Sequence, residues 1–208
     1  MISIDILLAF IAASALLAFA PGPDNIFVLT QSALSGRKAG ILVTLGLCTG
    51  LIVHTIAVAA GVAAIFQVSA VAFTALKAVG AAYLLYLAWG AFRAGAEDIE
   101  AGESNNLSAF ELYRRGIIMN ITNPKVAIFF LAFLPQFTNP NAGNVSLQIV
   151  SLGAVFMAVA FVCFSLIAIL SGFLSQLLRR SPKAQIILNR IAGTVFVALA
   201  IKLASSER

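Results

Sequence analysis

Pro21-Gly22-Pro23-Asp24-Asn25 interrupts an apolar segment, residues 4–34, in which one continuous helix would otherwise be expected. Each proline lacks a backbone donor and its ring clashes with the preceding turn, so a straight helix cannot pass through this stretch. The second proline also disfavours the helical conformation at the glycine before it. In lipid, non-helical backbone occurs only where protein buries it or where it lines a water-filled cavity. We therefore interpret this break as a site that carries a carboxylate and an amide.

The composition of the chain indicates a lipid environment. Of the 208 residues, 61% are hydrophobic and only 10% are charged. A soluble domain of this size has too little interior for so much apolar side chain. The formal charge of +5 comes from residues that flank apolar segments rather than gathering on one soluble face, so no nucleic-acid partner is expected. We predict an all-α, multi-pass protein embedded in a lipid bilayer.

Apolar segments predict six transmembrane helices, and each approaches or exceeds the roughly 20 residues that cross a bilayer core. For the fifth, two interpretations stay open: a tilted span, or a span that ends near Gly172 and continues as an interfacial tail. The N-terminal segment lacks the basic residue of a signal peptide and carries Asp5 instead, so we expect it to be retained. The six segments are residues 4–34, 39–66, 68–92, 116–137, 145–178 and 186–204.

The loops between these segments predict the orientation of the protein. The loops at 67–69 and 138–146 contain no lysine or arginine, whereas the other three contain eight. Because basic loops remain in the cytoplasm, both termini are expected outside. The eight residues are Arg37, Lys38, Arg93, Arg114, Arg115, Arg179, Arg180 and Lys183.

The only long polar stretch, from 94 to 110, divides the chain into halves of three spans each. Its four acidic residues among Gly and Asn predict a solvated cytoplasmic loop. We predict one transporter domain, 1–208, with repeat one at 1–93, the loop at 94–111 and repeat two at 112–208. An odd number of spans per half makes the second repeat inverted relative to the first.

An inverted repeat requires the fourth span to carry a break that matches the first. Asn120-Ile121-Thr122-Asn123-Pro124-Lys125 is such a break, and paired interruptions of this kind indicate a transporter binding site. Lys125 follows Arg115 by ten residues and Asp24 precedes Arg37 by thirteen, which places them about 15 and 20 Å deep. Both breaks are therefore expected near the midplane of a core about 30 Å thick.

The residue types at the two breaks suit a zwitterion. A charge at the bilayer centre costs about 2.5–3.5 kcal/mol, so it is retained where it pairs or serves a polar pathway. Asp24 and free helix carbonyls would bind an ammonium or the coupling proton, while Lys125 and half-helix N-termini would bind a carboxylate. The alternative, that Asp24 and Lys125 only neutralise each other and join the two spans, stays open. The predicted substrate site is Pro21, Gly22, Pro23, Asp24, Asn25, Thr122, Asn123, Pro124 and Lys125.

Two further features of the second apolar segment carry predictions. His54 is expected about 24 Å from the cytoplasmic face, near the outer surface and apart from both breaks. It would act either as a proton carrier or as a hydrogen-bonding partner of a neighbouring helix. Gly46-Leu47-Cys48-Thr49-Gly50 has small residues four positions apart, which indicates close helix packing inside the bundle rather than a dimer face. A homo-oligomer therefore stays open.

Three motifs follow one another along the chain: Pro21-Gly22-Pro23-Asp24-Asn25, then Lys77 with Gly80-Ala81-Ala82-Tyr83-Leu84, then Asn123-Pro124-Lys125 leading through Phe129-Phe130 to Leu134-Pro135-Gln136-Phe137. With them the chain resembles the LysE/RhtB family of bacterial amino-acid exporters over essentially its whole length. The resemblance implies export of amino acids or close derivatives across the inner membrane, driven by the proton gradient and without a bound cofactor. It does not fix the substrate, since members export basic, neutral and sulfur-containing amino acids.

Three other classes of function fit the sequence less well than amino-acid export. A metal-ion exporter needs several converging ligands, and the spans offer only Asp24, His54, Cys48 and Cys163. An intramembrane enzyme is disfavoured because the spans contain no metal motif, no serine with a base and no paired aspartates, so no catalytic residues are expected. A passive channel or scaffold would not concentrate its solute.

Overall fold

The computed structural model describes residues 2–68, 70–96 and 107–205. Every regular element in these residues is a helix. Most of the acidic stretch that we predict to be a cytoplasmic loop, residues 97–106, lies outside the described residues. The all-α prediction is confirmed for the part of the chain that the structure describes.

The helices divide into straight spans and bent pairs. Four segments are long and apolar enough to cross a membrane: Arg37–Gly61, Thr74–Arg93, Val145–Ile169 and Pro182–Ser205. Two pairs form further candidate spans, Ile4–Phe19 with Pro23–Ser35, bent by 61°, and Ala109–Thr122 with Pro124–Phe137, bent by 51°. The helices therefore supply four candidate spans, or six if each bent pair counts as one, as a multi-pass membrane protein requires. The helices are α1 (Ile4–Phe19), α2 (Pro23–Ser35), α3 (Arg37–Val68), α4 (Ala70–Arg93), α5 (Ala109–Thr122), α6 (Pro124–Ile128), the π-helix η1 (Phe129–Phe133), the 3₁₀ helices η2 (Leu134–Phe137) and η3 (Pro140–Ala142), α7 (Val145–Ile169), α8 (Ser171–Arg180) and α9 (Pro182–Ser205).

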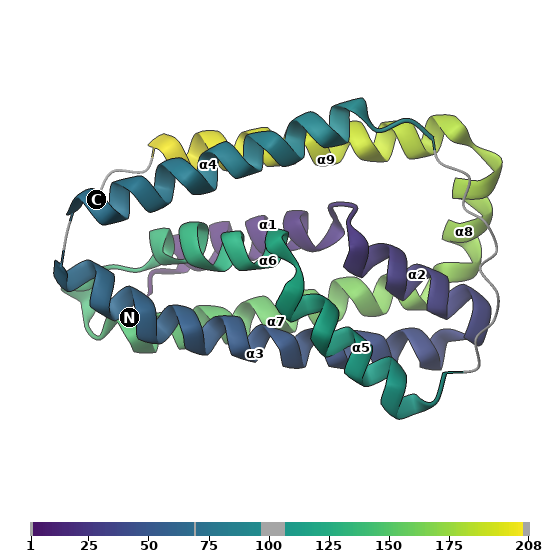
Figure 1. Ribbon diagram of the computed structural model, residues 1–208, viewed down its shortest axis with the longest axis horizontal. Helices are drawn as coiled ribbons and strands as arrows, with labels where there is room; N and C mark the ends of the chain where they lie inside the picture. The colour runs from purple at the N-terminus through teal and green to yellow at the C-terminus, as the bar shows by residue number, and fades with distance from the viewer. Residues whose placement is uncertain (1, 69, 97–106, 206–208) are drawn as a thin grey trace.

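One part of each bent pair lies between two pairs of long helices. Figure 1 shows α4 beside α9 on one side of the bundle and α3 beside α7 on the other. α1 and α6 run between these pairs. Both termini lie at one end of the bundle, and α8 lies at the opposite end (Figure 1). This arrangement brings the two breaks into the middle of the protein.

Both breaks have the same local cause. Pro23 and Pro124 each occupy the first turn of the helix that follows the break, where the missing N–H costs nothing. Asn123 prepares the second restart, because its Oδ1 accepts a hydrogen bond from the backbone N–H of Lys125 at 3.0 Å. α5 itself starts at a capping box in which Ser108 and Glu111 exchange hydrogen bonds.

The fifth apolar segment does not continue as one tilted helix. α7 ends at Ile169, and the amphipathic helix α8 follows after Leu170. α8 packs against α2 and α9 while Phe173 stays exposed. Of the two open interpretations, the structure agrees with a span that ends shortly before Gly172.

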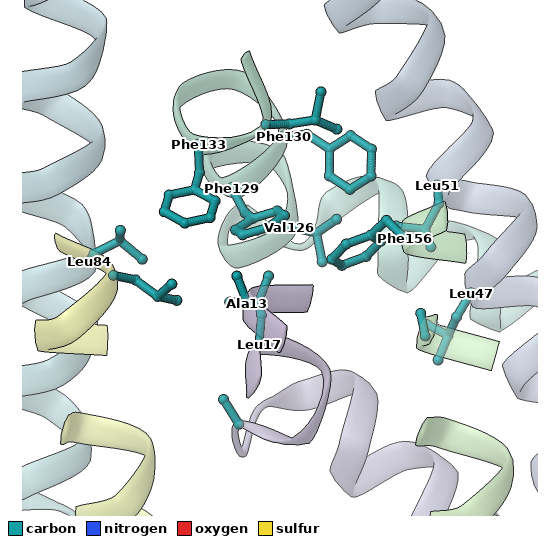
Figure 2. Close-up of a cluster of buried hydrophobic side chains, with 14 of the residues drawn as sticks. Ala13, Leu17, Leu47, Leu51, Leu84, Val126, Phe129, Phe130, Phe133 and Phe156 are labelled. Atoms are coloured by element: carbon teal, nitrogen blue, oxygen red, sulfur yellow. The ribbon is translucent and has the colours of Figure 1, made fainter. Parts of the chain in front are cut away.

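The core of the bundle is built on the π-helix η1. Phe129, Phe130 and Phe133 are at most 1% exposed. Figure 2 shows these rings between Ala13 and Leu17 of α1, Leu47 and Leu51 of α3, Leu84 of α4, and Phe156 of α7. Because the backbone N–H of Phe129 also bonds the carbonyl of Lys125, this packing fixes the turn that carries the lysine.

Close packing of α3 against α5 positions the second break. A Cβ atom on Gly46 would overlap the carbonyl oxygen of Tyr113, and one on Gly50 would lie 2.7 Å from Cβ of Asn120. On the α5 side, a Cβ on Gly116 would lie 2.5 Å from the carbonyl oxygen of Val43. The prediction that Gly46 and Gly50 serve packing inside the bundle is confirmed.

Candidate functional site

The carbonyl groups at the C-terminal end of α1 meet side chains from both breaks. The last four carbonyls of a helix lack intrahelical partners and carry partial negative charge. Lys125 Nζ donates to the carbonyl oxygens of Ala20 at 3.0 Å and Leu17 at 3.5 Å. Asn25 Nδ2 donates to the carbonyl oxygen of Ala18 at 2.6 Å. The cation of the second break therefore caps the helix that ends at the first.

The carboxylate of Asp24 is buried in the first turn of α2. Its side chain is 2% exposed, and Oδ2 accepts a hydrogen bond from Asn120 Nδ2 at 3.5 Å. Oδ1 has no hydrogen-bond partner. The carboxylate lies in the first turn of α2, at the positive end of that helix's dipole.

Asp24 and Lys125 share one site without a direct ion pair. Lys125 joins the two broken helices, as the structural alternative required, but it does so through the α1 carbonyls rather than through the carboxylate. Neutralisation by a direct contact is therefore not the arrangement in this structure. Each charge keeps capacity for a further partner.

The two charges line a common cavity of about 10 Å³. Such a volume holds about one water molecule, so no larger solute fits in this conformation. Buried polar atoms are almost always hydrogen-bonded. Four unpaired polar atoms nevertheless lie at the two breaks: Asp24 Oδ1, Asn25 Oδ1, Asn120 Oδ1 and Asn123 Nδ2. This concentration of unused hydrogen-bonding capacity is typical of a binding site rather than of a structural core.

Of the other predicted site residues, the glycine and the prolines lie at the breaks themselves, whereas the threonine is exposed. Gly22 lies against Lys125, because a Cβ atom on the glycine would be 3.0 Å from Nζ. Pro23 and Pro124 are exposed and act through the backbone, and the half-buried Pro21 lies between the two helices. Thr122 is exposed, and its hydroxyl donates to the carbonyl oxygen of Ile118 at 2.8 Å. Its side chain is therefore not brought to the cavity.

Two residues join the site that we did not predict for it. Asn120 is 1% exposed and lines the cavity. His54 Nε2 lies 3.1 Å from the carbonyl oxygen of Asn120. The prediction that His54 lies apart from both breaks is wrong, whereas its second expected role, a hydrogen bond to a neighbouring helix, is confirmed.

The error in placing His54 has a geometric cause. α3 has 32 residues and is about 48 Å long, which exceeds a core of about 30 Å, and in a tilted helix distance along the axis overstates depth. A pattern in the sequence nevertheless indicates that His54 lies on the helix face that packs against α5. Gly46, Gly50 and His54 recur every fourth residue on one helical face, and the glycines of that face pack against α5.

The donors needed for a metal site do not converge in the described residues. No group of three or more His, Cys, Asp or Glu side chains occurs among residues 2–68, 70–96 and 107–205. Cys48 and Cys163 are free thiols on α3 and α7. Of these metal-binding residue types, Asp24 lines the central cavity, and His54 contacts the backbone carbonyl of Asn120.

Comparisons with known proteins identify a family for this chain. The model of the LysE type translocator family matches residues 15–207. The chain is 33% identical over 200 residues to the homoserine/homoserine lactone efflux protein of Salmonella typhimurium, and the alignment covers 96% of each chain. It is 31% identical over 205 residues to a Bacillus subtilis protein named uncharacterized membrane protein YrhP, over 94% of this chain and 97% of the relative. No solved structure matches the chain. These names indicate a transporter rather than an enzyme.

Proposed function

The chain belongs to the LysE type translocator family, as a transmembrane efflux transporter, and from this premise we propose that it exports amino acids or close derivatives across the bacterial inner membrane. Transport is secondary, with the proton gradient as its energy source and without a bound cofactor. One observation carries the proposal. Unpaired polar atoms gather at the two helix breaks, and two of their residues, Asp24 and Asn120, line one central cavity together with the ammonium of Lys125.

The unpaired atoms match the groups of an amino acid. An ammonium group has three N–H donors. Three unpaired acceptor oxygens belong to Asp24, Asn25 and Asn120, and one of them is charged. The remaining unpaired donor, Asn123 Nδ2, would bind the substrate carboxylate together with Lys125. Charge-assisted hydrogen bonds of this kind contribute about 1.5–3 kcal/mol each.

In the proposed site, the substrate's amino group is a more general requirement for binding than its carboxylate. Homoserine and its lactone, which the name of the Salmonella relative pairs, both carry the amine, but the lactone has no carboxylate. A site in which Asp24 binds the amine accepts both compounds. Lys125 would then discriminate between them, because it faces the group in which they differ.

Substrate access requires the halves to move, because the central cavity is closed at about 10 Å³. We propose alternating access, with residues 1–93 and 112–208 as inverted repeats and with the basic loops in the cytoplasm. The packing supports this relation: α3 of the first half contacts α5, and its counterpart α7 contacts α1. Asp24 would bind either the amine or the exchanged proton in each half of the cycle.

Counterflow in proteoliposomes tests the proposal. Vesicles loaded with unlabelled homoserine should accumulate labelled homoserine through the purified protein, with saturation and with inhibition by related amino acids. The panel should include homoserine lactone, basic, neutral and sulfur-containing amino acids, and divalent metal ions. Saturable flux of a metal ion without flux of any amino acid would overturn the proposal.

A further inference from the structure

A second and larger cavity lies at the end of the bundle that carries both termini. Its volume is about 290 Å³, roughly thirty times that of the central cavity. The first turns of α1, the helices η1 and η2, and the last turn of α9 surround it. Small-molecule sites begin at about 300 Å³, so this cavity has room for a small organic solute.

Groups of opposite charge line this outer cavity from different helices. Asp5 lies in the first turn of α1, and Lys202 lies in the last turn of α9. Lys202 Nζ lies 4.8 Å from the ring centre of Phe137, which holds the ammonium on the cavity wall. Phe133 and Phe137 add an apolar surface. A zwitterion with a short side chain meets a complementary group for each of its parts.

A row of aromatic rings separates the outer cavity from the central one. Phe133, on the outer cavity, packs against Phe129 with ring centres 4.9 Å apart. Phe129 packs against Phe156 at 5.2 Å, and Phe156 lines the central cavity. Figure 2 shows these three rings in sequence from one side of the core to the other. The two cavities are therefore neighbours along one path with an aromatic barrier between them.

We propose that the outer cavity is a second binding site for one small zwitterionic amino acid, with the ammonium at Asp5 and the carboxylate at Lys202. Binding there does not depend on the central site. Its role as a release station on the outer side rests on the proposed export function. A phospholipid headgroup also pairs an ammonium with an anion, and the experiment separates this source from the free amino acid.

Protection of a cysteine from chemical labelling tests this site. Ala9→Cys places a thiol on the cavity wall in a chain whose own thiols are removed by Cys48→Ala and Cys163→Ala. The chain also carries Asp24→Asn, which disables the central site. Spheroplasts are treated with a membrane-impermeant maleimide, with and without homoserine. Homoserine at nine times its dissociation constant should slow labelling about tenfold.

Matched variants and ligands define the chemistry of the protection. Leu8→Cys is the control, because this neighbouring side chain is 57% exposed and lies outside the cavity lining, so homoserine should leave its labelling rate unchanged. Asp5→Asn and Lys202→Gln should each remove the protection at Ala9→Cys. N-acetylhomoserine, which lacks the ammonium, should not protect.

The outcomes separate this proposal from the transport function. Protection that persists with Asp24→Asn supports the outer site, even if counterflow by the wild-type chain fails. Protection that is absent, or that disappears with Asp24→Asn, overturns it, even if counterflow succeeds. Labelling in proteoliposomes that slows with phosphatidylethanolamine content and ignores homoserine also overturns it. Should the cysteine variants not fold, homoserine should still raise the melting temperature of Asp24→Asn but not of Asp5→Asn/Asp24→Asn.

Discussion

The ammonium of Lys125 donates a hydrogen bond to the carbonyl oxygen of Ala20 at 3.0 Å, across 105 positions of sequence. The contact connects the second helix break to the first and satisfies a carbonyl that the first break leaves without a partner. It also gives Gly22 a role, because the glycine leaves room for the lysine head. The Lys125 side chain thus stabilises the two helix breaks and also supplies the positive charge of the site.

Asp24→Asn should abolish export while the protein remains inserted in the membrane. The change removes the charge opposite the substrate ammonium and should weaken binding roughly ten- to hundredfold, from a charge-assisted hydrogen bond of about 1.5–3 kcal/mol. Counterflow of homoserine measures the loss. Glu111→Gln is the matched control, since it is the same chemical change on the exposed start of α5 and keeps the capping box. Wild-type flux through Asp24→Asn would contradict the assignment.

Lys125→Gln separates the structural role of this residue from its role in binding. Glutamine can still donate to the α1 carbonyls but carries no charge, so the melting temperature in detergent should change little. Flux of homoserine should fall at least tenfold, whereas flux of homoserine lactone, which has no carboxylate, should fall much less. An equal loss for both compounds would show that the charge does not act on the carboxylate. Lys125→Met, which also removes the donor, should lower stability by about 1–3 kcal/mol.

Gly22→Ala should slow transport severalfold without unfolding the protein. The added Cβ would lie 3.0 Å from Lys125 Nζ, so the lysine head must shift by a few tenths of an ångström. Gly90→Ala is the control, because nothing lies within 4 Å of a Cβ atom at that position. The comparison needs initial counterflow rates and melting temperatures of both variants. If Gly22→Ala and Gly90→Ala transport at the same rate, the position of the Lys125 ammonium does not limit the transport rate.

Gly46→Ala should lower stability. Its Cβ would overlap the backbone carbonyl oxygen of Tyr113, which cannot rotate away, so α5 must move from α3. Overpacking of this kind costs about 1–3 kcal/mol. The melting temperature in detergent should fall relative to Gly90→Ala, and the position of Asn120 at the far end of the same interface should be disturbed. An unchanged melting temperature would show that the two helices do not pack this closely.

His54→Ala should reduce homoserine counterflow and gradient-driven export by the same factor. The residue acts by holding the carbonyl of Asn120, 3.1 Å from Nε2, and hence by positioning the amide next to Asp24. A proton carrier would behave differently, because its loss leaves counterflow intact and stops only the gradient-driven reaction. Parallel assays on one preparation decide between the two roles.

Local chemistry made the breaks predictable. Pro23 and Pro124 would each kink or break a helix that continued through them, so the sequence pattern is enough to locate both interruptions. Apolar length similarly predicted the four long helices that could cross a membrane, although the fifth segment is shorter than expected, because α7 ends at Ile169 before α8 begins. The π-helical conformation of η1 had no local sign, since it depends on how its phenylalanines pack among α1, α4 and α7.

The direction in which side chains point was harder to predict from the sequence. Thr122 and Asn120 are two residues apart in one motif, yet the threonine is exposed and the asparagine is 1% exposed. Helical geometry separates such positions by about 200°, but it does not say which of them faces the cavity. The packing of α5 against the glycines of α3 decides that question.

By itself the sequence determined three properties of this chain: it is a membrane protein, its helices break at two predictable positions, and one acidic and one basic residue accompany the breaks. These properties follow from hydropathy and from proline sterics, which act over a few residues. Only the tertiary structure decided that Lys125 binds the α1 carbonyls, that Asn120 and His54 belong to the site and that Thr122 does not. Those outcomes depend on the rotation of each helix about its axis, and contacts between residues more than 100 positions apart set that rotation.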